Sequence, residues 1–410
     1  MLDQLFIRRP VLSRLQTELF GAYLDSLADT LHQQGYARTT IRDYLYACDK
    51  FGGWLTQRGC SIADTSKPLI KRYICRLKRT SGTNHPKAGR GLSHLARLLQ
   101  PQGIINDDPK EPVTEAERWL IRYDAYLDQV IGAAANTRDR YRTIIRRFLA
   151  SRFGTGPVCW NTLTAADLSE FICQEVCVRR GFGRKGPGVA VRSLLRFLVF
   201  SGELQPGLEA AVPTVRQWQH ATLPQRLTAE QVAQLLASCD TATPLGRRDR
   251  AILLLLARLG LRAGEVVQLR LDDIDWRVGQ LQIQPIKTHR ERCLPLPREV
   301  GEALMVYLLD GRPTSTSRIV FLSNRPPFAP FTGPTRVGWV VRRACRRAGF
   351  PPELWIGAHA LRHSAASQMV CQGASFKAVA DVLGHRSLQT TGIYAKLDLA
   401  TLERVALPGP

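Results

Sequence analysis

The chain has 410 residues, 44% of them hydrophobic, and carries a formal net charge of +22 at pH 7. This hydrophobic fraction is typical of globular proteins and excludes large-scale disorder, and the length predicts two or three domains instead of a single core. The basic excess is spread along the whole chain, and arginine outnumbers lysine. Because a field of this sign attracts polyanions, the composition favours a nucleic acid as the partner.

The ten cysteines show no paired spacing. Cys173 and Cys177 are one helical turn apart, but no second pair and no nearby histidine completes a zinc-binding set. We therefore expect buried, reduced thiols and no metal. No apolar run approaches the length that crosses a bilayer, and the first residues lack the apolar stretch of a secretion signal. These features predict a soluble, cytoplasmic protein.

The N-terminal half contains an internal repeat. A threonine, a tyrosine and a phenylalanine at positions 40, 44 and 51 recur at positions 137, 141 and 148. The segment 72–75 resembles 170–173, and the leucine-rich segment 95–99 resembles 194–198. The displacement is 97 to 99 residues throughout. Several matches at one displacement predict two copies of one structural module.

Each copy is predicted to be a small helical bundle. Leu24, Leu27 and Leu31 in the first copy are spaced for one face of a helix. Thr39-Thr40 and Asn136-Thr137 are the expected N-caps of the second helix in each copy. Packing of the apolar residues does not account for the arginines that lie among them in the second copy, at Arg138, Arg140, Arg142, Arg146 and Arg147.

Two segments are predicted connectors, 81–91 and 204–224, because they are rich in glycine or proline and have little apolar rhythm. After the second connector, Thr228 is expected to cap a new helix, and the first alternating strand candidates appear at 281–284 and 292–296. The expected organisation is a helical module at 1–110, a second at 111–208, a linker at 209–224 and a mixed α/β domain at 225–410.

Cleaving a phosphodiester without a metal requires cationic donors, a proton donor and a nucleophile, and the last domain carries all three kinds of group. Arg262 follows an apolar helix that ends at a glycine and begins the next helix, where the helix N-terminus adds to its positive field. Glu265 lies on the adjacent turn. Lys287 lies between the two strand candidates, at the tip of a predicted hairpin, where it can reach an anion.

A second group of such residues lies closer to the C-terminus. His359 and Arg362 are three residues apart and share one helix face, which places a proton-transfer group beside a guanidinium. His385 follows an amphipathic helix in the triplet Leu383-Gly384-His385, and Tyr394 comes nine residues later.

The order of these residues resembles the tyrosine recombinase (phage integrase) family. The match includes Gly-Leu-Arg-x-x-Glu at 260–265, His-x-Leu-Arg-His at 359–363, Leu-Gly-His at 383–385 and the tyrosine beyond them. The resemblance covers roughly residues 225–400 strongly. It implies a mainly α chain with a C-terminal mixed α/β catalytic domain of the tyrosine recombinase type. The two N-terminal helical modules resemble the family's SAM-like core-binding domain more loosely, and most members have one such module.

The resemblance implies a role for each residue. Tyr394 would attack a backbone phosphate of DNA and form a 3′-phosphotyrosine. Arg262 and Arg362 would hold the non-bridging phosphate oxygens, and Lys287 would be the general acid for the departing 5′ oxygen. Arg290 and Arg292 share the predicted hairpin with Lys287, and either could donate to the phosphate instead; an arginine, however, effectively does not lose its proton.

The remaining roles follow in the same way. His359 would assist proton removal from the tyrosine hydroxyl, His385 would hydrogen-bond to the phosphate, and Glu265 would orient its neighbours. The family also implies double-stranded DNA recombination sites, a homotetramer on DNA, possible partner recombinases, a Holliday junction, and neither metal, ATP nor any other cofactor. The long chain with its extra module favours a mobile-element integrase. The expected localisation is cytoplasmic, in association with the nucleoid.

Two other functions stay open on the sequence. A type IB topoisomerase or hairpin telomere resolvase shares the tyrosine chemistry, although the spacing from Leu-Gly-His to tyrosine disfavours it. A DNA-binding regulator with an inactive catalytic fold is disfavoured because every expected catalytic residue type is present. The extra module at 1–110 either grips a flanking DNA segment or contacts another protein subunit.

Overall fold

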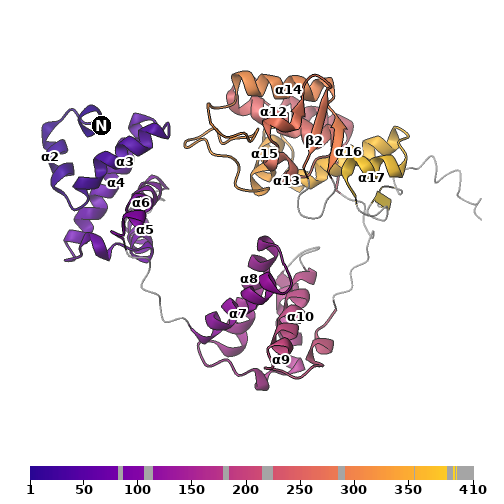
Figure 1. Cartoon of the computed structure of the whole chain (residues 1–410), viewed down its shortest axis with the longest axis horizontal. Coiled ribbons are helices and arrows are strands. Elements are labelled where there is room, and N and C mark those ends of the chain that lie inside the picture. Colours follow the sequence, from indigo (N-terminus) through magenta and orange to yellow (C-terminus); the bar gives the residue numbers. More distant parts are fainter. Residues whose placement is uncertain are drawn as a thin grey trace, which may run out of the picture. The chain divides into compact units, whose positions relative to one another are not determined.

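Figure 1 shows the structure of the chain, a computed structural model. It describes residues 1–81, 86–105, 114–178, 184–214, 225–284, 291–354, 356–385, 391–392 and 394. By its internal contacts the chain divides into two compact units, one made of residues 1–54, 86–91 and 220–410 and the other of residues 55–85 and 92–219. This division does not follow the boundaries expected from the sequence, so the four expected segments stay a prediction.

The chain begins with α1 (Leu2–Leu5), α2 (Arg9–Thr17), α3 (Gly21–Gln33) and α4 (Arg38–Thr56). The face of α3 predicted from leucine spacing is confirmed, because Leu24, Leu27 and Leu31 are all buried. The ring of Phe51 on α4 stacks on Phe20, with the ring centroids 5.9 Å apart. These first helices therefore pack through the apolar positions that the helical period selects.

α5 (Lys67–Ser81) and α6 (Pro86–Leu99) follow, with 3-10 turns at Ile62–Asp64 and Gln100–Gln102. The connector predicted at 81–91 is wrong, because α6 begins inside it. Proline is tolerated in the first helical turn, where its missing N–H has no helical partner. A Cβ on Gly91 would lie 3.0 Å from the Cα of Tyr44, so this glycine permits a close approach of α6 to α4. The proline and the glycine that suggested a loop therefore begin a helix and allow it to pack closely on α4.

The second copy contains α7 (Glu115–Gln129), α8 (Ala135–Phe153), α9 (Ala165–Val178) and α10 (Lys185–Phe200), with 3-10 turns at Trp160–Thr162 and Leu208–Ala211. Its helices follow those of the first copy at nearly constant displacement. α4 and α8 both have 19 residues and begin 97 positions apart, while the starts of α5 and α9 are 98 apart and those of α6 and α10 are 99 apart. The predicted repeat is confirmed at the level of individual helices.

The predicted N-caps of the second helix in each copy are wrong. α8 begins at Ala135, so Asn136-Thr137 lie within its first turn, and α4 likewise begins ahead of Thr39-Thr40. The preceding Ala134 makes no side-chain cap. Asparagine and threonine are good caps, but the cap is decided by where the chain enters the helix.

Two residues of the linker predicted at 209–224, Val212 and Thr214, contact the second copy. Val212 is buried in the core of the second copy. Arg192 of α10 donates to the carbonyl oxygen of Val212 at 2.7 Å and to the Thr214 hydroxyl at 2.7 Å. The segment up to Thr214 therefore belongs to the second copy, and residues 215–224 lie outside the described part of the chain.

The C-terminal domain contains helices and one small sheet, as predicted. Its helices are α11 (Ala229–Ala237), α12 (Pro244–Arg258), α13 (Ala263–Gln268), α14 (Arg298–Asp310), α15 (Thr335–Arg347), α16 (Ala358–Cys371) and α17 (Phe376–Leu383), with 3-10 turns at Leu271–Asp273 and Pro352–Leu354. The strands β1 (Ile274–Asp275), β2 (Gln280–Ile283) and β3 (Arg292–Pro295) form an antiparallel sheet in that order. Thr228 caps α11, accepting from the backbone N–H of Gln231 at 3.2 Å.

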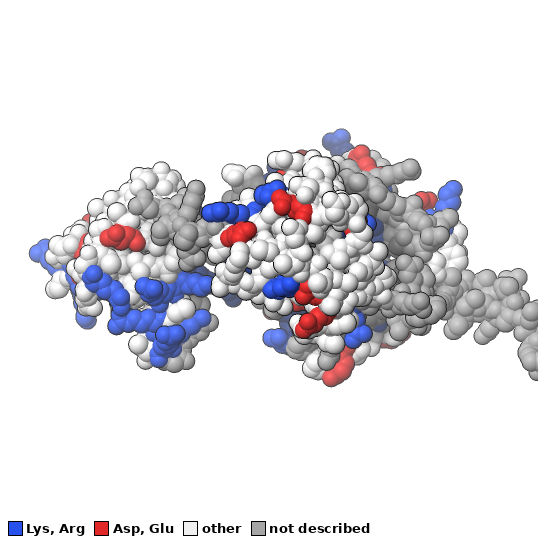
Figure 2. Space-filling view, turned by 90° about the horizontal axis from the view of Figure 1, so that it is seen from below, with Lys and Arg blue, Asp and Glu red and all other residues white. Residues whose placement is uncertain are grey.

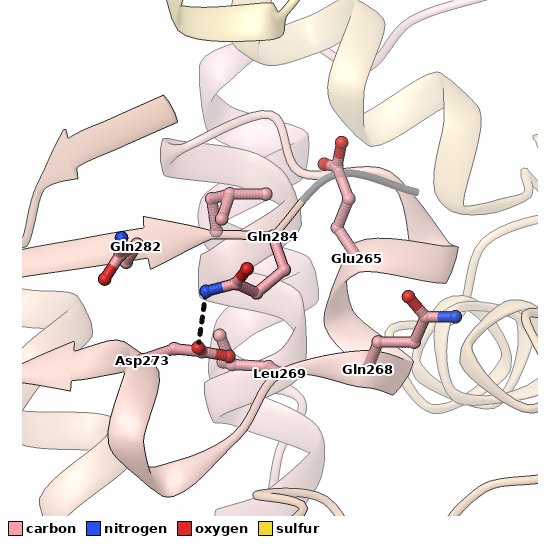
Figure 3. Close-up of a pocket in the computed structure, with 7 residues that line it drawn as sticks. Glu265, Gln268, Leu269, Asp273, Gln282 and Gln284 are labelled. Atoms are coloured by element: carbon pink, nitrogen blue, oxygen red, sulfur yellow. Dashed lines mark hydrogen bonds between the residues drawn. The ribbon is translucent and has the colours of Figure 1, made fainter. Parts of the chain in front are cut away.

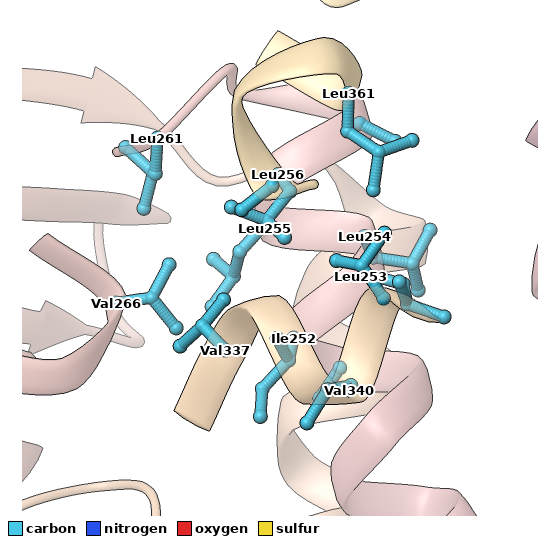
Figure 4. Close-up of a cluster of buried hydrophobic side chains, with 14 of the residues drawn as sticks. Ile252, Leu253, Leu254, Leu255, Leu256, Leu261, Val266, Val337, Val340 and Leu361 are labelled. Atoms are coloured by element: carbon cyan, nitrogen blue, oxygen red, sulfur yellow. The ribbon is translucent and has the colours of Figure 1, made fainter. Parts of the chain in front are cut away.

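The core of this domain is built around α12. Ile252 through Leu256 are all fully buried, so the helix is covered on every side. Figure 4 shows these side chains among Val337 and Val340 of α15 and Leu361 of α16. Burying each such side chain contributes roughly 1.5–3 kcal/mol, which makes α12 a rigid support for the loop that follows it. Within the described part of the chain, no helix is both long and apolar enough to span a membrane.

We predict that Gly260→Ala destabilises the domain more than Gly279→Ala. Both glycines have positive φ, +61° and +66°, which costs an L residue roughly 1–2 kcal/mol. A Cβ at position 260 would also meet Leu383 Cδ2 at 2.6 Å, whereas nothing lies within 4 Å of a Cβ at position 279. Urea unfolding measures the two losses. Equal losses would contradict a packing role for Gly260.

Candidate active site

The first predicted site residue is held by the turn between α12 and α13. Gly260 adopts a left-handed conformation just after α12, and Arg262 is the N-cap residue of α13. The backbone N–H of Arg262 donates to Glu265 Oε2 at 2.7 Å, and its Nη1 donates to Oε1 at 3.0 Å. Both ends of Arg262 are therefore fixed by one carboxylate.

Glu265 also binds a second arginine. Arg292 of β3 donates through Nη1 and Nη2 to its two carboxylate oxygens at 3.0 and 2.8 Å. The Glu265 side chain is only 2% exposed. Burial by itself would raise the pKa of Glu265, but the hydrogen bonds and charges of Arg292 and Arg262 outweigh it and lower the pKa below its ordinary value. Glu265 is thus an ionised group that joins α13 to the sheet.

Figure 3 shows Glu265 standing on α13 beside a small pocket, in which Gln284 donates to Asp273 at 3.3 Å. The volume of this pocket is about 10 Å³, which is room for no more than one water molecule. The pocket is therefore too small to hold a substrate.

Arg362 of α16 lies beside Arg262 at the end of α17. The Arg362 side chain is buried and donates to the carbonyl oxygens of Gly260 and Leu383, both at 2.6 Å. Arg262 donates to the carbonyl oxygens of Leu383 and Gly384, both at 3.2 Å. Burial and the charge of Arg262 lower the pKa of Arg362 to about 9. Two cations held together with little solvent form a site that an anion would stabilise.

The predicted histidines flank these arginines. His359 is exposed on α16, and its ring is nearly perpendicular to that of His363, with the centroids 4.9 Å apart. His385 lies just after α17, and its Nδ1 is hydrogen-bonded to the Thr391 hydroxyl at 2.8 Å. Burial and the nearby arginines lower the pKa of His385 to about 4. Partial burial of the His359 ring, with Arg362 and Arg262, lowers the pKa of His359, although the residue as a whole is exposed. Both histidines are therefore neutral at pH 7 in the DNA-free protein.

Tyr394 is buried against α16 and α17. It is 1% exposed and packs in a cluster with Ala366, Val370, Val379 and Leu383. Its hydroxyl oxygen lies 2.7 Å from Nδ1 of His363. Burial raises the pKa of Tyr394 to about 12, although the charge of Arg362 opposes the rise.

The structure thus places all but one of the predicted site residues around α16 and the end of α17. Lys287 is the exception, because residues 285–290 lie outside the described part of the chain. Two further residues contact the predicted ones. Sequence reasoning gave His363 no role and considered Arg292 only as an alternative to Lys287. His363 is the final histidine of the His-x-Leu-Arg-His motif, and Arg292 was weighed only as a phosphate donor. A histidine one helical turn from His359 was the available signal for His363.

Arg292 is poorly placed to contact a phosphate. Two of its nitrogen atoms are bound to Glu265, and its Nε donates to the carbonyl oxygen of Val382 at 2.9 Å. Its side chain is 9% exposed. Arg292 therefore connects β3 to α13 and α17, and this favours Lys287 over Arg292 among the alternatives that the sequence left open.

The cysteines are free, but most are not buried. Cys48, Cys239 and Cys345 are buried, whereas Cys173 and Cys177 are exposed. The expectation of buried thiols is therefore wrong for that pair, because their face of α9 is directed to solvent. Among the described residues, no group of three His, Cys, Asp or Glu side chains could hold a metal ion.

Comparison with known proteins identifies the family of the chain. The model of the phage integrase family matches residues 225–400. A putative integrase/recombinase, y4rA of Sinorhizobium fredii (strain NBRC 101917 / NGR234), is 37% identical over 404 residues, 97% of each chain. The family and the fold are those of tyrosine-type site-specific DNA recombinases. The chain belongs to the phage integrase family.

More distant relatives are shorter than this chain. The tyrosine recombinase XerD of Listeria monocytogenes serotype 4b (strain F2365) is 31% identical over 287 residues, which covers 92% of XerD but 67% of this chain. A crystal structure of XerH bound to palindromic difH substrate in a post-cleavage complex has the same fold. It has a TM-score of 0.56 and 18% identity, and the match covers 72% of this chain and 97% of XerH. About a third of this chain therefore has no counterpart in XerD.

We predict that Glu265→Gln lowers the free energy of unfolding by about 3–5 kcal/mol, because two guanidinium groups lose their shared buried carboxylate. Glu302→Gln is the matched control. Glu302 is exposed and pairs with the exposed Arg298, so its loss should cost about 1 kcal/mol or less. Urea unfolding of both variants gives the comparison, and similar costs would argue against the structural role of Glu265.

The lowered pKa of Glu265 also predicts that the stability of the protein depends on pH. A carboxyl group whose pKa is lowered on folding stabilises the protein above its unfolded value, here 4.5, and loses that contribution as the pH falls through the folded value. The stability of the wild type should therefore fall more steeply below about pH 4.5 than that of Glu265→Gln. Parallel curves of stability against pH would contradict this sign.

Proposed function

We propose that this recombinase cleaves and rejoins DNA with Tyr394 as its nucleophile. The observation that supports the proposal best is that Arg262, Arg362 and Tyr394 all contact Leu383 at the end of α17. Phosphoryl transfer to a tyrosine needs cations at the phosphate and a hydroxyl within reach of them. Because the chain belongs to the phage integrase family, we assign these groups to the cleavage of a DNA phosphodiester.

In this proposal each side chain acts on one part of the phosphodiester. Arg262 and Arg362 bind the non-bridging oxygens and stabilise the charge of the pentacoordinate transition state. Lys287 protonates the 5′ oxygen as it leaves. His359 assists proton removal from Tyr394, and His385, which is neutral, donates a hydrogen bond to the phosphate.

The covalent step conserves the energy of the broken bond. The tyrosine oxygen bonds to phosphorus as the bond to the 5′ oxygen breaks, so the 3′-phosphotyrosine has about the same energy as the phosphodiester it replaces. Rejoining therefore needs no ATP, and because arginines supply the positive charge we expect no metal requirement. Strand exchange in two such steps would pass through a Holliday junction held by a homotetramer on two DNA sites, possibly with a partner recombinase.

We further propose that the chain serves a mobile element as an integrase. Relatives that match nearly the whole chain, y4rA and y4rF, are both described as putative integrase/recombinases. The XerD relatives lack a third of the chain. The additional length is therefore shared with proteins described as integrases.

Tyr394→Phe tests the nucleophile. Phenylalanine preserves the packing of the ring but removes the attacking oxygen, so we expect no covalent adduct while DNA binding is unchanged. The wild-type protein first selects its substrate from a library of nicked duplexes with a random core, by retention of DNA after denaturation in SDS. The selected duplex is then offered to both proteins. An equal, measurable amount of adduct with Tyr394→Phe would refute the assignment. If the wild-type protein itself formed no adduct, the chain would be an inactive DNA-binding regulator instead of a recombinase.

The extra N-terminal module is proposed to grip DNA beside the recombination site through α5. The solvent face of α5 carries five exposed basic side chains: Lys71, Arg72, Arg76, Lys78 and Arg79. The helix contains no acidic residue. None of these five side chains makes an ion pair with a residue in the described ranges. Figure 2 shows lysine and arginine side chains gathered at the left of the view, over the N-terminal helices.

The second copy of the repeat has the opposite pattern. Its counterpart of α5 is α9, which contains three acidic residues and no basic one. The arginines of α8 that the sequence left without an account are largely paired within the copy: Arg146 binds Glu117 at 3.0 Å, and Arg147 binds Glu175 at 3.1 Å. Two copies of one fold therefore differ in which helix offers unpaired positive charge, and this supports a DNA contact specific to the first.

Neutralising α5 tests this contact. Arg72→Gln/Arg76→Gln should shorten the DNA footprint on one flank and reduce the slope of log affinity against log salt by about 1–2, because each lost phosphate contact removes about 0.9. Arg298→Gln/Arg318→Gln is the matched control, since it removes the same charge from arginines that are already paired with Glu302 and Asp272. An equal effect of both variants would show that only net charge matters and would favour a subunit contact for the module.

A further inference from the structure

The segment that joins β2 to β3 is held where it leaves β2. The pairing of β2 with β3 ends at Ile283, so residues 284–291 join the two strands. Gln284, the first residue of this segment, donates through Nε2 to Oδ1 of Asp273 at 3.3 Å (Figure 3). Lys287 is three positions further along the sequence, outside the described part of the chain. We infer that Gln284 and Asp273 are a positioning pair for Lys287, an inference that rests on the proposed role of this lysine as the general acid.

A lysine in this segment needs help to reach the leaving oxygen reproducibly. A general acid acts only when its proton-bearing atom is within hydrogen-bond reach of that oxygen, roughly 2.6–3.2 Å. Lysine carries its ammonium group on a flexible stem, and ordering the stem and the surrounding backbone costs conformational entropy. A contact that fixes the first residue of the segment lowers this cost and sets the direction in which the chain leaves β2.

Asp273 is a well-fixed partner for Gln284. Asp273 is only 6% exposed, and its Oδ2 accepts a hydrogen bond from the backbone N–H of Arg270 at 2.8 Å. Strand β1 begins at the next residue and is paired with β2. One carboxylate therefore joins the turn after α13 to the sheet and, through Gln284, to the end of β2.

Two amides of β2 hold the two ends of the joining segment. Successive side chains of a strand point to opposite faces of the sheet, and Gln282 and Gln284 are both on the exposed face. Gln282 donates to the carboxylate of Glu291, the last residue of the segment. Gln284 donates to Asp273 at the first residue. The segment that contains Lys287 is therefore held at both of its ends.

The same end of the sheet is joined to an arginine of the candidate active site. Ile283 is paired in register with Arg292, whose guanidinium is bound to Glu265. Glu265 also binds Arg262, the proposed phosphate ligand. Figure 3 shows Glu265 and Gln284 beside the same small pocket. Loss of the Gln284 contact should therefore displace the proposed general acid while the contacts of both arginines remain.

Gln284→Ala tests the pair on two substrates. The position of the covalent adduct on the selected nicked duplex identifies the phosphate that is cleaved, and a second duplex carries sulfur in place of the 5′ oxygen at that phosphate. A thiolate leaves without taking up a proton, because thiols are far more acidic than alcohols. We expect Gln284→Ala to form adduct about three- to tenfold more slowly on the oxygen duplex, as for one lost hydrogen bond. On the sulfur duplex its rate should be close to that of the wild type.

Gln268→Ala is the matched control. Gln268 is an exposed amide that lines the same pocket from α13, and in Figure 3 no hydrogen bond joins it to Asp273. This variant should keep the wild-type rate on both duplexes. Lys287→Ala is the reference for loss of the general acid. Its rate should fall on the order of 10²–10⁴-fold on the oxygen duplex and recover for the most part on the sulfur duplex.

Asp273→Asn tests the other member of the pair. Asparagine keeps the shape of the side chain but has one oxygen for the two donors, Arg270 and Gln284. Its loss of rate on the oxygen duplex should also be restored by sulfur. Combining it with Gln284→Ala should add little to the loss, because both changes remove the same contact. Fully additive losses would contradict the pairing.

The two substrates also separate the inference from the proposed function. If Lys287→Ala is not rescued by sulfur, the proposed general acid is wrong and the inference falls with it. If Lys287→Ala is rescued but Gln284→Ala is equally slow on both duplexes, or is not slow at all, only the positioning role fails. A Gln284→Ala protein that unfolds at lower temperature is replaced by Gln284→Met, which keeps the length of the side chain and removes its amide.

Discussion

The carboxylate of Glu265 is almost fully buried and accepts hydrogen bonds from Arg262 and Arg292, which belong to different parts of the C-terminal domain. Arg292 also donates to the end of α17, and Arg262 does the same. The ionised Glu265 carboxylate therefore holds the start of α13 against strand β3 and, through the two arginines, against the end of α17. Removing a single partner would leave buried charge without compensation, so the positions of Arg262 and Arg292 both depend on Glu265.

The electrostatics of the site are those of a surface prepared for an anion. Two guanidinium groups, Arg262 and Arg362, lie together, and burial lowers the pKa of Arg362 to about 9. The same burial keeps His363 and His385 neutral, with pKa values of about 4. A phosphate would relieve the repulsion between the arginines and raise the basicity of the histidines together. If DNA binds there as proposed, phosphate binding and the basicity of the histidines would be coupled through one local field.

The repeat shows how one fold can carry two electrostatic roles. α5 and α9 occupy equivalent places in the two copies, yet one has a basic solvent face and the other contains only acidic charges. In the second copy, carboxylates from α7 and α9 neutralise arginines of α8. Because apolar residues define each bundle, the surface charge could change after duplication without disturbing the core.

The sequence by itself determined the repeat, the helices with clear apolar spacing, the hairpin strands and the family, because these depend on local periodicity and on short motifs. The predictions failed where the same residue types suit two kinds of structure. Pro86 and Gly91 suggested a loop, but α6 begins at the proline and packs on α4 at the glycine. Asn136 and Thr137 suggested an N-cap, but they lie inside α8. Only the tertiary structure decided that His363 contacts Tyr394 and that Glu265 joins two arginines across the domain. Those contacts depend on how α16, α17 and β3 pack together, and no local pattern in the chain encodes which of two neighbouring histidines will face a tyrosine thirty-odd residues away.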